Sequence, residues 1–210
     1  MKSARRQLQH ESVTQEILAT ARAIMREEGA AALSMQELAR RLDMRAPSLY
    51  NYFAGKNEIY DALFRLGFDQ FAAYIDAKVA GSQTWQEELR RYLEGYMAFA
   101  LENPELYQLC FERPVPGFVP SPASLEISVN TLRRAYAIAG RWREAIQTDL
   151  SAQQMTDLVL AVMHGLTALH IANEPHLPVG QGRFGSLILA AVSLFNQAWS
   201  GPLGSEGDKP

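Results

Sequence analysis

The sequence predicts an all-α fold, and two features of its pattern lead to this expectation. Apolar residues recur at spacings of three and four along most of the 210 residues, which is the period of one helix face. Hardly any stretch alternates polar and apolar residues, as a half-buried strand would. Because 48% of the residues are hydrophobic and 20% are charged, the chain can bury a substantial core. We expect about nine helices, three near the N-terminus and about six in the remainder.

The first three helices are predicted within residues 1–56. A helix is expected over Ser12–Glu28, and Gly29 is suited to end it. Ser34 followed by Glu37 predicts a capping box, in which each side chain satisfies a free amide at the start of the second helix. Pro47 suits the first turn of a third helix, over residues 46–53, because its missing N–H costs nothing there. Two short helices joined by a tight turn form the helix-turn-helix pattern.

The remainder, residues 57–200, predicts further helices separated by breaks. Three are expected over 56–80, over 84–101 and from Pro104 onward. Four prolines and one glycine fall within residues 113–122, so a helix cannot continue through this segment. Beyond this loop, helices are expected over 121–139, with Gly140 as an end or kink, over 151–172 behind a Ser151–Gln154 capping box, and over 183–199. The polar tail, residues 201–210, is expected to be disordered.

Composition limits the function classes that fit. The net charge of −3 divides into +3 for residues 1–56 and −6 for residues 57–210, so a polyanion is expected to meet only the N-terminal part. A single cysteine, Cys110, excludes an intrachain disulfide, and its apolar neighbours favour a buried thiol. We expect no secretory signal, and the apolar run over 158–172 is shorter than the roughly 20 residues of a membrane span. A soluble, cytoplasmic protein is the expectation.

The stretch from Ser34 to Lys56 is dense in hydroxyl, amide and basic side chains. A helix in the major groove must offer donors and acceptors to base edges, while neighbouring groups bind phosphates. Arg45, Ser48 and Asn51 suit bases, and Tyr50 and Tyr52 suit phosphate oxygens. Ser34 and Lys56, at helix starts, suit phosphates. The alternative is a capped helical corner whose polar side chains are merely solvated.

This part of the chain resembles the N-terminal domain of the tetracycline-repressor (TetR) family of bacterial transcriptional regulators. The resemblance rests on the apolar first helix ending at Glu28–Gly29, the capped second helix and the block "LYNYFAGK", which begins at Leu49. It implies DNA contacts by Ser34, Gln36, Arg45, Ala46, Pro47, Ser48, Tyr50, Asn51, Tyr52 and Lys56. Many members carry Ser-x-Gly where this chain has residues 46–48 as Ala-Pro-Ser, which leaves the operator sequence open.

The resemblance also implies a C-terminal domain, residues 57–200, for ligand binding and dimerisation. The segment "VMHGLTALHIANEP" is similar to a His-Gly-Leu motif of one subgroup, with Met163 where tryptophan is usual. In this family the last two long helices of each subunit pack across a two-fold axis. The implied interface residues are Met155, Leu158, Val162, Leu166, Leu169, Ile188, Ala191, Leu194 and Phe195. Periodicity alone does not separate such an interface from an internal core.

A ligand pocket is expected among the aromatic and polarisable residues of this domain. The residues expected to line it are Tyr92, Tyr96, Phe99, Tyr107, Phe111, Met163 and His164. Together they indicate a mostly apolar ligand, with the tyrosine hydroxyls and His164 as orienting groups, although each also suits a plain core. His164, His170 and His176 are spaced too widely for one helix face, so no metal is expected.

No nucleophile motif, phosphate-binding loop or catalytic carboxylate pair is evident, so we expect neither an enzyme nor a cofactor. The hypothesis is a homodimeric repressor that binds a palindromic operator and is released by a small, mostly apolar inducer. The alternative is an all-helical small-molecule binding protein or enzyme that retains a vestigial helix-turn-helix corner.

Overall fold

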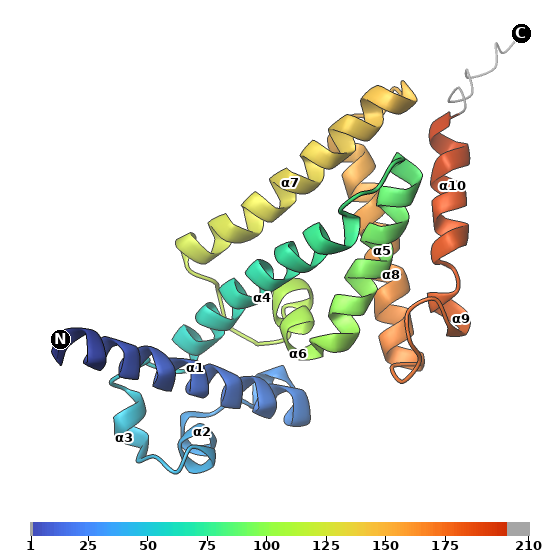
Figure 1. Cartoon of the computed structure of the whole chain (residues 1–210). Helices are drawn as coiled ribbons and strands as arrows, with labels where there is room; N and C mark the ends of the chain where they lie inside the picture. The colour runs from blue at the N-terminus through green and yellow to red at the C-terminus, as the bar shows by residue number, and fades with distance from the viewer. Residues whose placement is uncertain (1, 201–210) are drawn as a thin grey trace, which may run out of the picture. The chain divides into compact units, whose positions relative to one another are not determined.

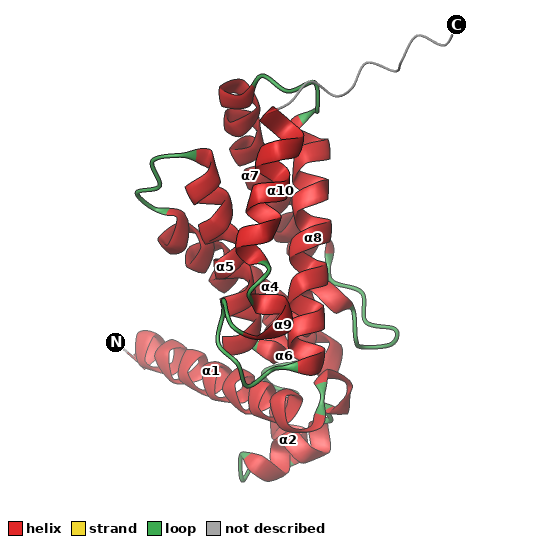
Figure 2. Cartoon of the chain, turned by 90° about the vertical axis from the view of Figure 1, so that its right-hand side faces the viewer, coloured by secondary structure: helices red, strands yellow, loops and turns green. Residues whose placement is uncertain are grey.

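The computed structural model describes residues 2–200, so the predicted polar tail, residues 201–210, lies outside the described residues. Every regular element across residues 2–200 is helical, as Figures 1 and 2 show. Ten α-helical segments occur in this range, three of them only four residues long. The prediction of an all-α fold with about nine helices is confirmed.

The chain folds into two compact units that alternate along the sequence. The first unit runs up to Gln70 and resumes over Asn103–Ser128. The second unit holds Phe71–Glu102 and the described chain from Val129 onward. Helices α4 (Lys56–Val79) and α7 (Pro122–Ile146) therefore each contribute residues to both units.

The first unit contains the N-terminal helices and a short helical segment from the middle of the chain. Besides the beginnings of α4 and α7, its elements are α1 (Lys2–Glu28), η1 (Ala30–Ala32), α2 (Met35–Arg41), α3 (Ala46–Leu49), α6 (Pro104–Tyr107) and the π-helical turn η2 (Gln108–Glu112). The predicted start of the first helix at Ser12 is wrong, since α1 already begins at Lys2. Residues 5–12 are exposed, and their helix-favouring side chains extend α1 without an apolar face.

The two predicted capping boxes differ in outcome. At α8 (Ala152–Asn173) both bonds form, because the Ser151 amide donates to Gln154 Oε1 at 2.9 Å and the Gln154 amide donates to Ser151 Oγ at 3.1 Å. At α2 the Glu37 amide donates to Ser34 Oγ at 3.2 Å, but Glu37 does not return the bond. Its carboxylate instead accepts hydrogen bonds from two arginines, so only half of that capping box is confirmed.

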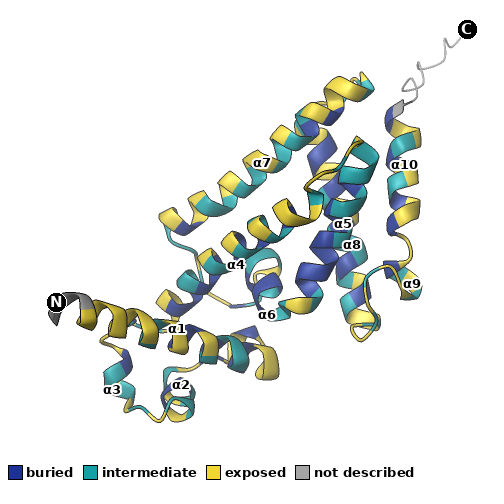
Figure 3. Ribbon diagram, viewed as in Figure 1, coloured by how far each residue is buried: buried dark blue, intermediate teal, exposed yellow. Residues whose placement is uncertain are grey.

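The second unit is built around α5 (Trp85–Glu102), nine of whose residues are buried (Figure 3). The remaining elements are the later parts of α4 and α7, and α8, α9 (Gly182–Gly185) and α10 (Ile188–Ser200). Helix α7 does not end at Gly140, which corrects one reading of that glycine. The turns after Gly140 carry Trp142, which is buried and donates its indole N–H to Glu88 at 2.7 Å. This anchor keeps α7 helical to Ile146.

The last predicted helix, over 183–199, is in fact two helices, α9 and α10, separated by Ser186 and Leu187. Gly185 lies against the buried ring of His170, where a Cβ would come within 3.2 Å of two ring atoms. The absence of a Cβ at Gly185 therefore lets α9 pack closely on α8.

Helix α8 is longer than the apolar run suggested. It has 22 residues and an 18-residue window with a mean hydropathy of 1.4, so by length and composition it could cross a membrane. The prediction that this segment is too short for a span is therefore wrong. Only 33% of that window is buried, and a core helix of a soluble protein can have the same composition.

Candidate nucleic-acid interface and ligand cavity

Helices α2 and α3 form a helix-turn-helix, and its core is small. Leu38, Ala39 and Leu49 are buried, and the turn between the helices includes Asp43 with a left-handed φ of 52°. The α-helix of α3 ends at Leu49, not at residue 53 as predicted. The chain then turns so that Phe53, whose amide donates to Leu49 O at 3.0 Å, points into the core.

All ten predicted DNA contacts lie at the surface of this motif or partly at its surface. The exposed ones are Ser34, Gln36, Arg45, Pro47, Tyr50, Asn51 and Lys56. Ala46, Ser48 and Tyr52 are half-buried. Tyr50 is 54% exposed, which is unusual for a large aromatic side chain and leaves its hydroxyl accessible. Their contacts with DNA stay a prediction.

Tyr52 is held by a residue that the sequence did not single out. Its ring packs on the ring of His10 in α1, with the centroids 4.7 Å apart and the planes at 30°. This contact exists because α1 begins well before Ser12, and no local pattern in the sequence indicates it. It positions the segment after α3 against the first turns of α1.

Arg41 joins the end of α1 to α2. Its guanidinium lies 2.6 Å from Glu27, 2.5 Å from Glu28 and 2.8 Å from Glu37. Hydrogen bonds from Arg40 and then from Arg41 lower the pKa of the Glu37 carboxyl to about 2. Glu37 therefore stays charged throughout the physiological pH range and holds both arginines on α2.

A buried carboxylate ties α1 to α6. The side chain of Glu105 has no exposed surface, and its two oxygens accept bonds from Arg22 Nε at 2.7 Å and Arg26 Nε at 2.9 Å. Arg22 also donates to the side-chain oxygen of Asn103 at 2.9 Å. A buried charge persists only when it is paired in this way. The cluster has no signature in the sequence, because its members are about 80 residues apart.

Tyr60 and Asp61 of α4 connect the helix-turn-helix to the proline-rich loop. The Tyr60 hydroxyl donates to the Ala30 carbonyl at 2.7 Å, and its ring packs on Phe118 with centroids 5.5 Å apart. Asp61 accepts bonds from the Ser121 amide at 2.7 Å and the Ser121 hydroxyl at 3.0 Å. Although burial opposes charge there, the bonds from Ser121 and Ser124 lower the pKa of Asp61.

The predicted pocket residues fall into separate groups. Tyr107 and Phe111 stack in the first unit, with ring centroids 5.7 Å apart. In the second unit the Tyr96 hydroxyl lies 3.1 Å from His164 Nδ1, while Phe99 and Met163 are buried. Tyr92 is buried too, and burial raises its pKa to about 12. Ligand binding by these residues stays a prediction.

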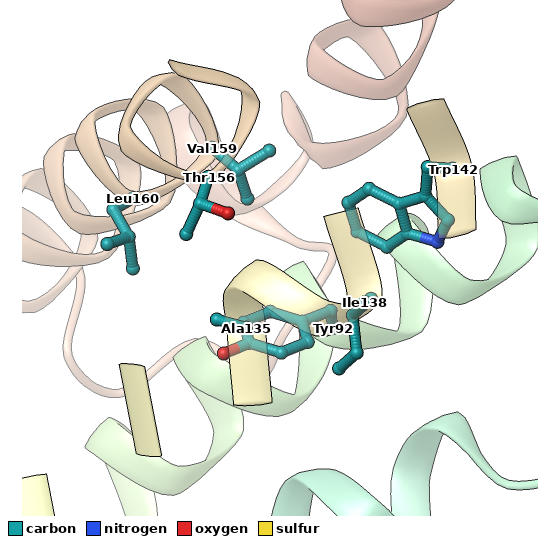
Figure 4. A pocket seen from close by; sticks show the side chains of 7 residues that line it. All are labelled: Tyr92, Ala135, Ile138, Trp142, Thr156, Val159 and Leu160. Carbon is teal, nitrogen blue, oxygen red and sulfur yellow. The ribbon is translucent and has the colours of Figure 1, made fainter. Parts of the chain in front are cut away.

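Tyr92 lines a cavity among α5, α7 and α8 that Figure 4 shows from close by. Its other walls are Ala135, Ile138, Trp142, Thr156, Val159 and Leu160. The volume is only about 20 Å³, enough for a single water at roughly 10–15 Å³. This cavity is too small for an organic ligand as it stands.

A much larger cavity, about 270 Å³, lies wholly within the first unit. Its lining residues are Phe64 and Phe68 of α4, Leu109 and Cys110 of η2, Arg113, Pro114, Val115, Phe118, Val119 and Pro120 of the following loop, and Leu125 and Ser128 of α7. This site was not predicted from the sequence, in which the prolines of the loop indicate only the end of a helix. The signal available was the loop's unusual content of apolar residues between prolines.

The histidines do not gather. His170 is fully buried, with Nε2 3.0 Å from the Leu177 carbonyl, and its Nδ1 has no hydrogen-bond partner among residues 5–199. His164 pairs with Tyr96, and His176 is exposed. Over the same range no three or more His, Cys, Asp or Glu side chains are placed to hold a metal.

The predicted dimer residues divide by exposure. Leu158, Val162, Leu169 and Leu194 are exposed, between 36% and 67%, and Leu166 is half-buried. Met155, Ile188, Ala191 and Phe195 are buried within the chain itself. Two further leucines of this region, Leu187 and Leu189, are exposed. Helices α8 and α10 thus combine core residues with an uncovered apolar face.

Comparison with known proteins gives two family matches. Residues 17–63 match the family described as bacterial regulatory proteins, tetR family. Residues 89–192 match the family described as tetracyclin repressor-like, C-terminal domain. The assignment to the His-Gly-Leu subgroup stays a prediction.

Individual relatives have low sequence identity to this chain. The chain is 27% identical over 116 residues to the HTH-type transcriptional regulator Rv1816 of Mycobacterium tuberculosis, covering 53% of this chain and 49% of that protein. It therefore spans about half the length of the curated relatives that it matches. A protein of unknown function from Rhodococcus sp. RHA1 superposes with a TM-score of 0.76 at 19% identity, covering 90% of this chain and 95% of that one.

The TetR family regulator PfmR from Thermus thermophilus superposes with a TM-score of 0.66 at 21% identity, covering 85% of this chain and 92% of that one. At such identities the solved structures establish the fold alone. The two family matches, together with the helix-turn-helix described above, establish more: this chain belongs to the TetR family of bacterial transcriptional regulators.

Proposed function

We propose that this regulator acts as a homodimeric repressor, which binds a palindromic operator and is released by a small ligand. The observation that carries the DNA-binding part is the exposure of Tyr50 and Asn51 beside Arg45 and Lys56 on the helix-turn-helix. Polar and aromatic side chains that are not used in the core are free to meet phosphates and base edges. The cytoplasm, where the operator lies, is the proposed site of action.

The uncovered apolar face of α8 and α10 supports a homodimer. Leu158, Val162 and Leu169 of α8 lie at helical spacing, and Leu194 of α10 is 67% exposed. Several exposed large apolar residues on two helices are typical of a surface that a partner covers. The proposed interface therefore uses the exposed residues and not the buried Met155 or Phe195.

Symmetry then sets the form of the operator. A two-fold dimer presents two copies of α3, so its half-sites are expected to be inverted repeats spaced by whole helical turns. Release requires a ligand that binds better to a state that cannot engage both half-sites. Only that difference in affinity moves the equilibrium.

The test is salt-dependent DNA binding by the wild-type chain. Duplexes selected by the protein from a random-sequence pool should share an inverted repeat, and log Kd should rise linearly with log salt concentration. A mobility-shift titration at several salt concentrations measures this slope. A chain that selects no sequence and binds DNA without a salt dependence would instead be a helical binding protein with a vestigial helix-turn-helix.

A further inference from the structure

The 270 Å³ cavity of the first unit has the dimensions and the walls of a small-molecule site. Its volume is close to the lower end of the roughly 300–1,000 Å³ of typical ligand pockets. Phe64, Phe68 and Phe118 supply three aromatic side chains to its lining. The first two are almost completely buried, so an apolar group bound among them would be removed from contact with water, which favours binding.

The cavity's rim carries features that a folded core does not explain. Val119 is 77% exposed and Leu125 is 40% exposed, although both are large and apolar. Arg113 adopts a left-handed φ of 50°, which is uncommon for a residue other than glycine. Its guanidinium has no hydrogen-bond or ion-pair partner among residues 5–199, the range over which side chains are described. Arg113 is exposed, so its guanidinium is accessible at the rim of the cavity, and it is suited to the planar, bidentate binding of a carboxylate there.

We propose, building on the ligand-released regulator above, that this cavity binds a small monocarboxylic acid with an apolar body. The ring or short chain of the acid lies among Phe64, Phe68 and Phe118, and its carboxylate pairs with Arg113. This assigns an anionic ligand to the chain, whereas the acidic C-terminal part of the sequence would by itself favour a cation.

The cavity is connected to the helix-turn-helix by two short routes within the first unit. Phe118, in the cavity wall, packs on Tyr60, whose hydroxyl donates to the Ala30 carbonyl at 2.7 Å. Ala30 opens η1, and Ser34 caps α2 only a few residues later. A ligand that displaces Phe118 therefore changes the support of α2.

The second route runs through the short helices behind the cavity. Leu109 and Cys110, which line it, belong to η2, and η2 follows directly on α6. Glu105 of α6 holds Arg22 and Arg26 of α1. A shift of η2 is thus passed to α1 through a buried ion pair that has few alternative arrangements.

Binding is tested by calorimetry with benzoate, phenylacetate and octanoate, each compared with its uncharged amide. Wild type should bind at least one of the acids, and each amide more weakly than its acid. Arg113→Gln should weaken acid binding by about tenfold, as loss of a charge-assisted pair does. Arg143→Gln removes an exposed arginine of α7 that lines no described cavity and should leave acid binding unchanged. Absence of binding by all three acids, or wild-type affinity in Arg113→Gln, overturns the proposal.

Cys110 allows a second measurement of ligand binding, by chemical labelling of its thiol. It is the chain's only cysteine and it lines the cavity. Burial raises the pKa of its thiol, so labelling by N-ethylmaleimide should be slow. The acid that binds should slow labelling further in wild type, and not in Arg113→Gln at the same concentration. Equal labelling with and without a bound acid would place that acid elsewhere.

Coupling to DNA is tested with Tyr60→Phe, which removes the hydrogen bond to Ala30 and keeps the ring against Phe118. In wild type the acid should weaken DNA binding by about 5- to 150-fold. Tyr60→Phe should bind the acid as wild type does but respond to it less. The matched control is Tyr74→Phe. Tyr74 lies later on α4, and the substitution removes the hydrogen bond from its hydroxyl to Glu102, so this variant should respond to the acid as wild type does. An unchanged response in Tyr60→Phe overturns the route through Tyr60.

The two proposals can fail separately. Salt-dependent DNA binding without any acid binding overturns the carboxylate site alone and leaves the regulator standing. Arg113-dependent acid binding by a chain that selects no DNA sequence supports the site and overturns the regulator.

Discussion

The carboxylate of Glu105 bridges Arg22 and Arg26 across two helices, at 2.7 Å and 2.9 Å from their Nε atoms. Glu105 is completely buried, whereas the two arginine side chains are 23% and 50% exposed. The ion pairs therefore join the surface of α1 to a buried residue in the first turn of α6. This arrangement makes Glu105 the residue whose loss leaves two positive charges uncompensated.

Glu105→Ala is expected to lower the free energy of unfolding by about 1.5–3 kcal/mol, the contribution of hydrogen bonds to charged groups, because the two arginines that remain are partly exposed to water. Urea denaturation followed by circular dichroism measures this loss. Glu126→Ala, which removes an exposed carboxylate from α7, is the control and should change stability by less than about 0.5 kcal/mol. Similar stabilities of the two variants would mean that the Glu105 cluster is not structural.

Glu37 should make stability depend on pH. The pKa of Glu37 in the folded chain is about 2, below the value of 4.5 expected for an unperturbed glutamate. The stabilisation from Arg40 and Arg41 is therefore complete above pH 4.5 and is lost as the pH falls towards 2. The urea midpoints of wild type and Glu37→Gln should therefore differ at neutral pH and converge near pH 2. Glu16→Gln, an exposed position on α1, should show no such convergence. A pH-independent difference for Glu37→Gln would contradict the ion pairs.

The predicted DNA contacts differ in the effect of their removal. Tyr50→Ala and Lys56→Ala should weaken binding to all duplexes alike, and Lys56→Ala should reduce the salt slope by about 1. Asn51→Ala should cost about 1–3 kcal/mol on the preferred sequence and relax base preference. Mobility shifts with selected and scrambled duplexes separate these outcomes. Lys78→Ala, an exposed lysine later on α4, serves as the control. Wild-type binding by all three variants would refute the proposed interface.

Leu194→Glu should convert the proposed dimer to a monomer, because it places a charge in an apolar contact. Sedimentation velocity measures the change in mass. Leu8→Glu introduces the same charge at a leucine of α1 that is equally exposed, 66% against 67%, and should leave the mass unchanged. A wild-type chain that sediments as a monomer would remove the basis for a palindromic operator.

Much of the fold follows from local patterns. Helix α8 starts where Ser151 and Gln154 cap it, and α2 starts at Ser34, because these bonds link residues only three apart. Pro47 lies in the first turn of α3 for the same local reason. The helix-turn-helix was predictable because its core, its caps and its exposed polar residues all fall within about twenty consecutive residues.

The errors share a cause in contacts between distant residues. The early start of α1 accompanies the packing of His10 on Tyr52, and the continuation of α7 past Gly140 accompanies the bond from Trp142 to Glu88. Neither partner is visible from the neighbouring sequence. Local propensity is a weak signal that such tertiary contacts override.

The sequence by itself determined the helical class, most helix boundaries and the residues offered by the helix-turn-helix, since all of these depend on short-range periodicity and capping. Only the tertiary structure decided which apolar residues of α8 and α10 stay exposed, that Glu105 is buried between two arginines, and that the proline-rich loop encloses a cavity beside Arg113. Burial and charge pairing at these places depend on side chains that the fold brings together from separate segments. Apolar residues also recur at the same helical spacing whether the helix face packs in a core, against a partner or against a ligand.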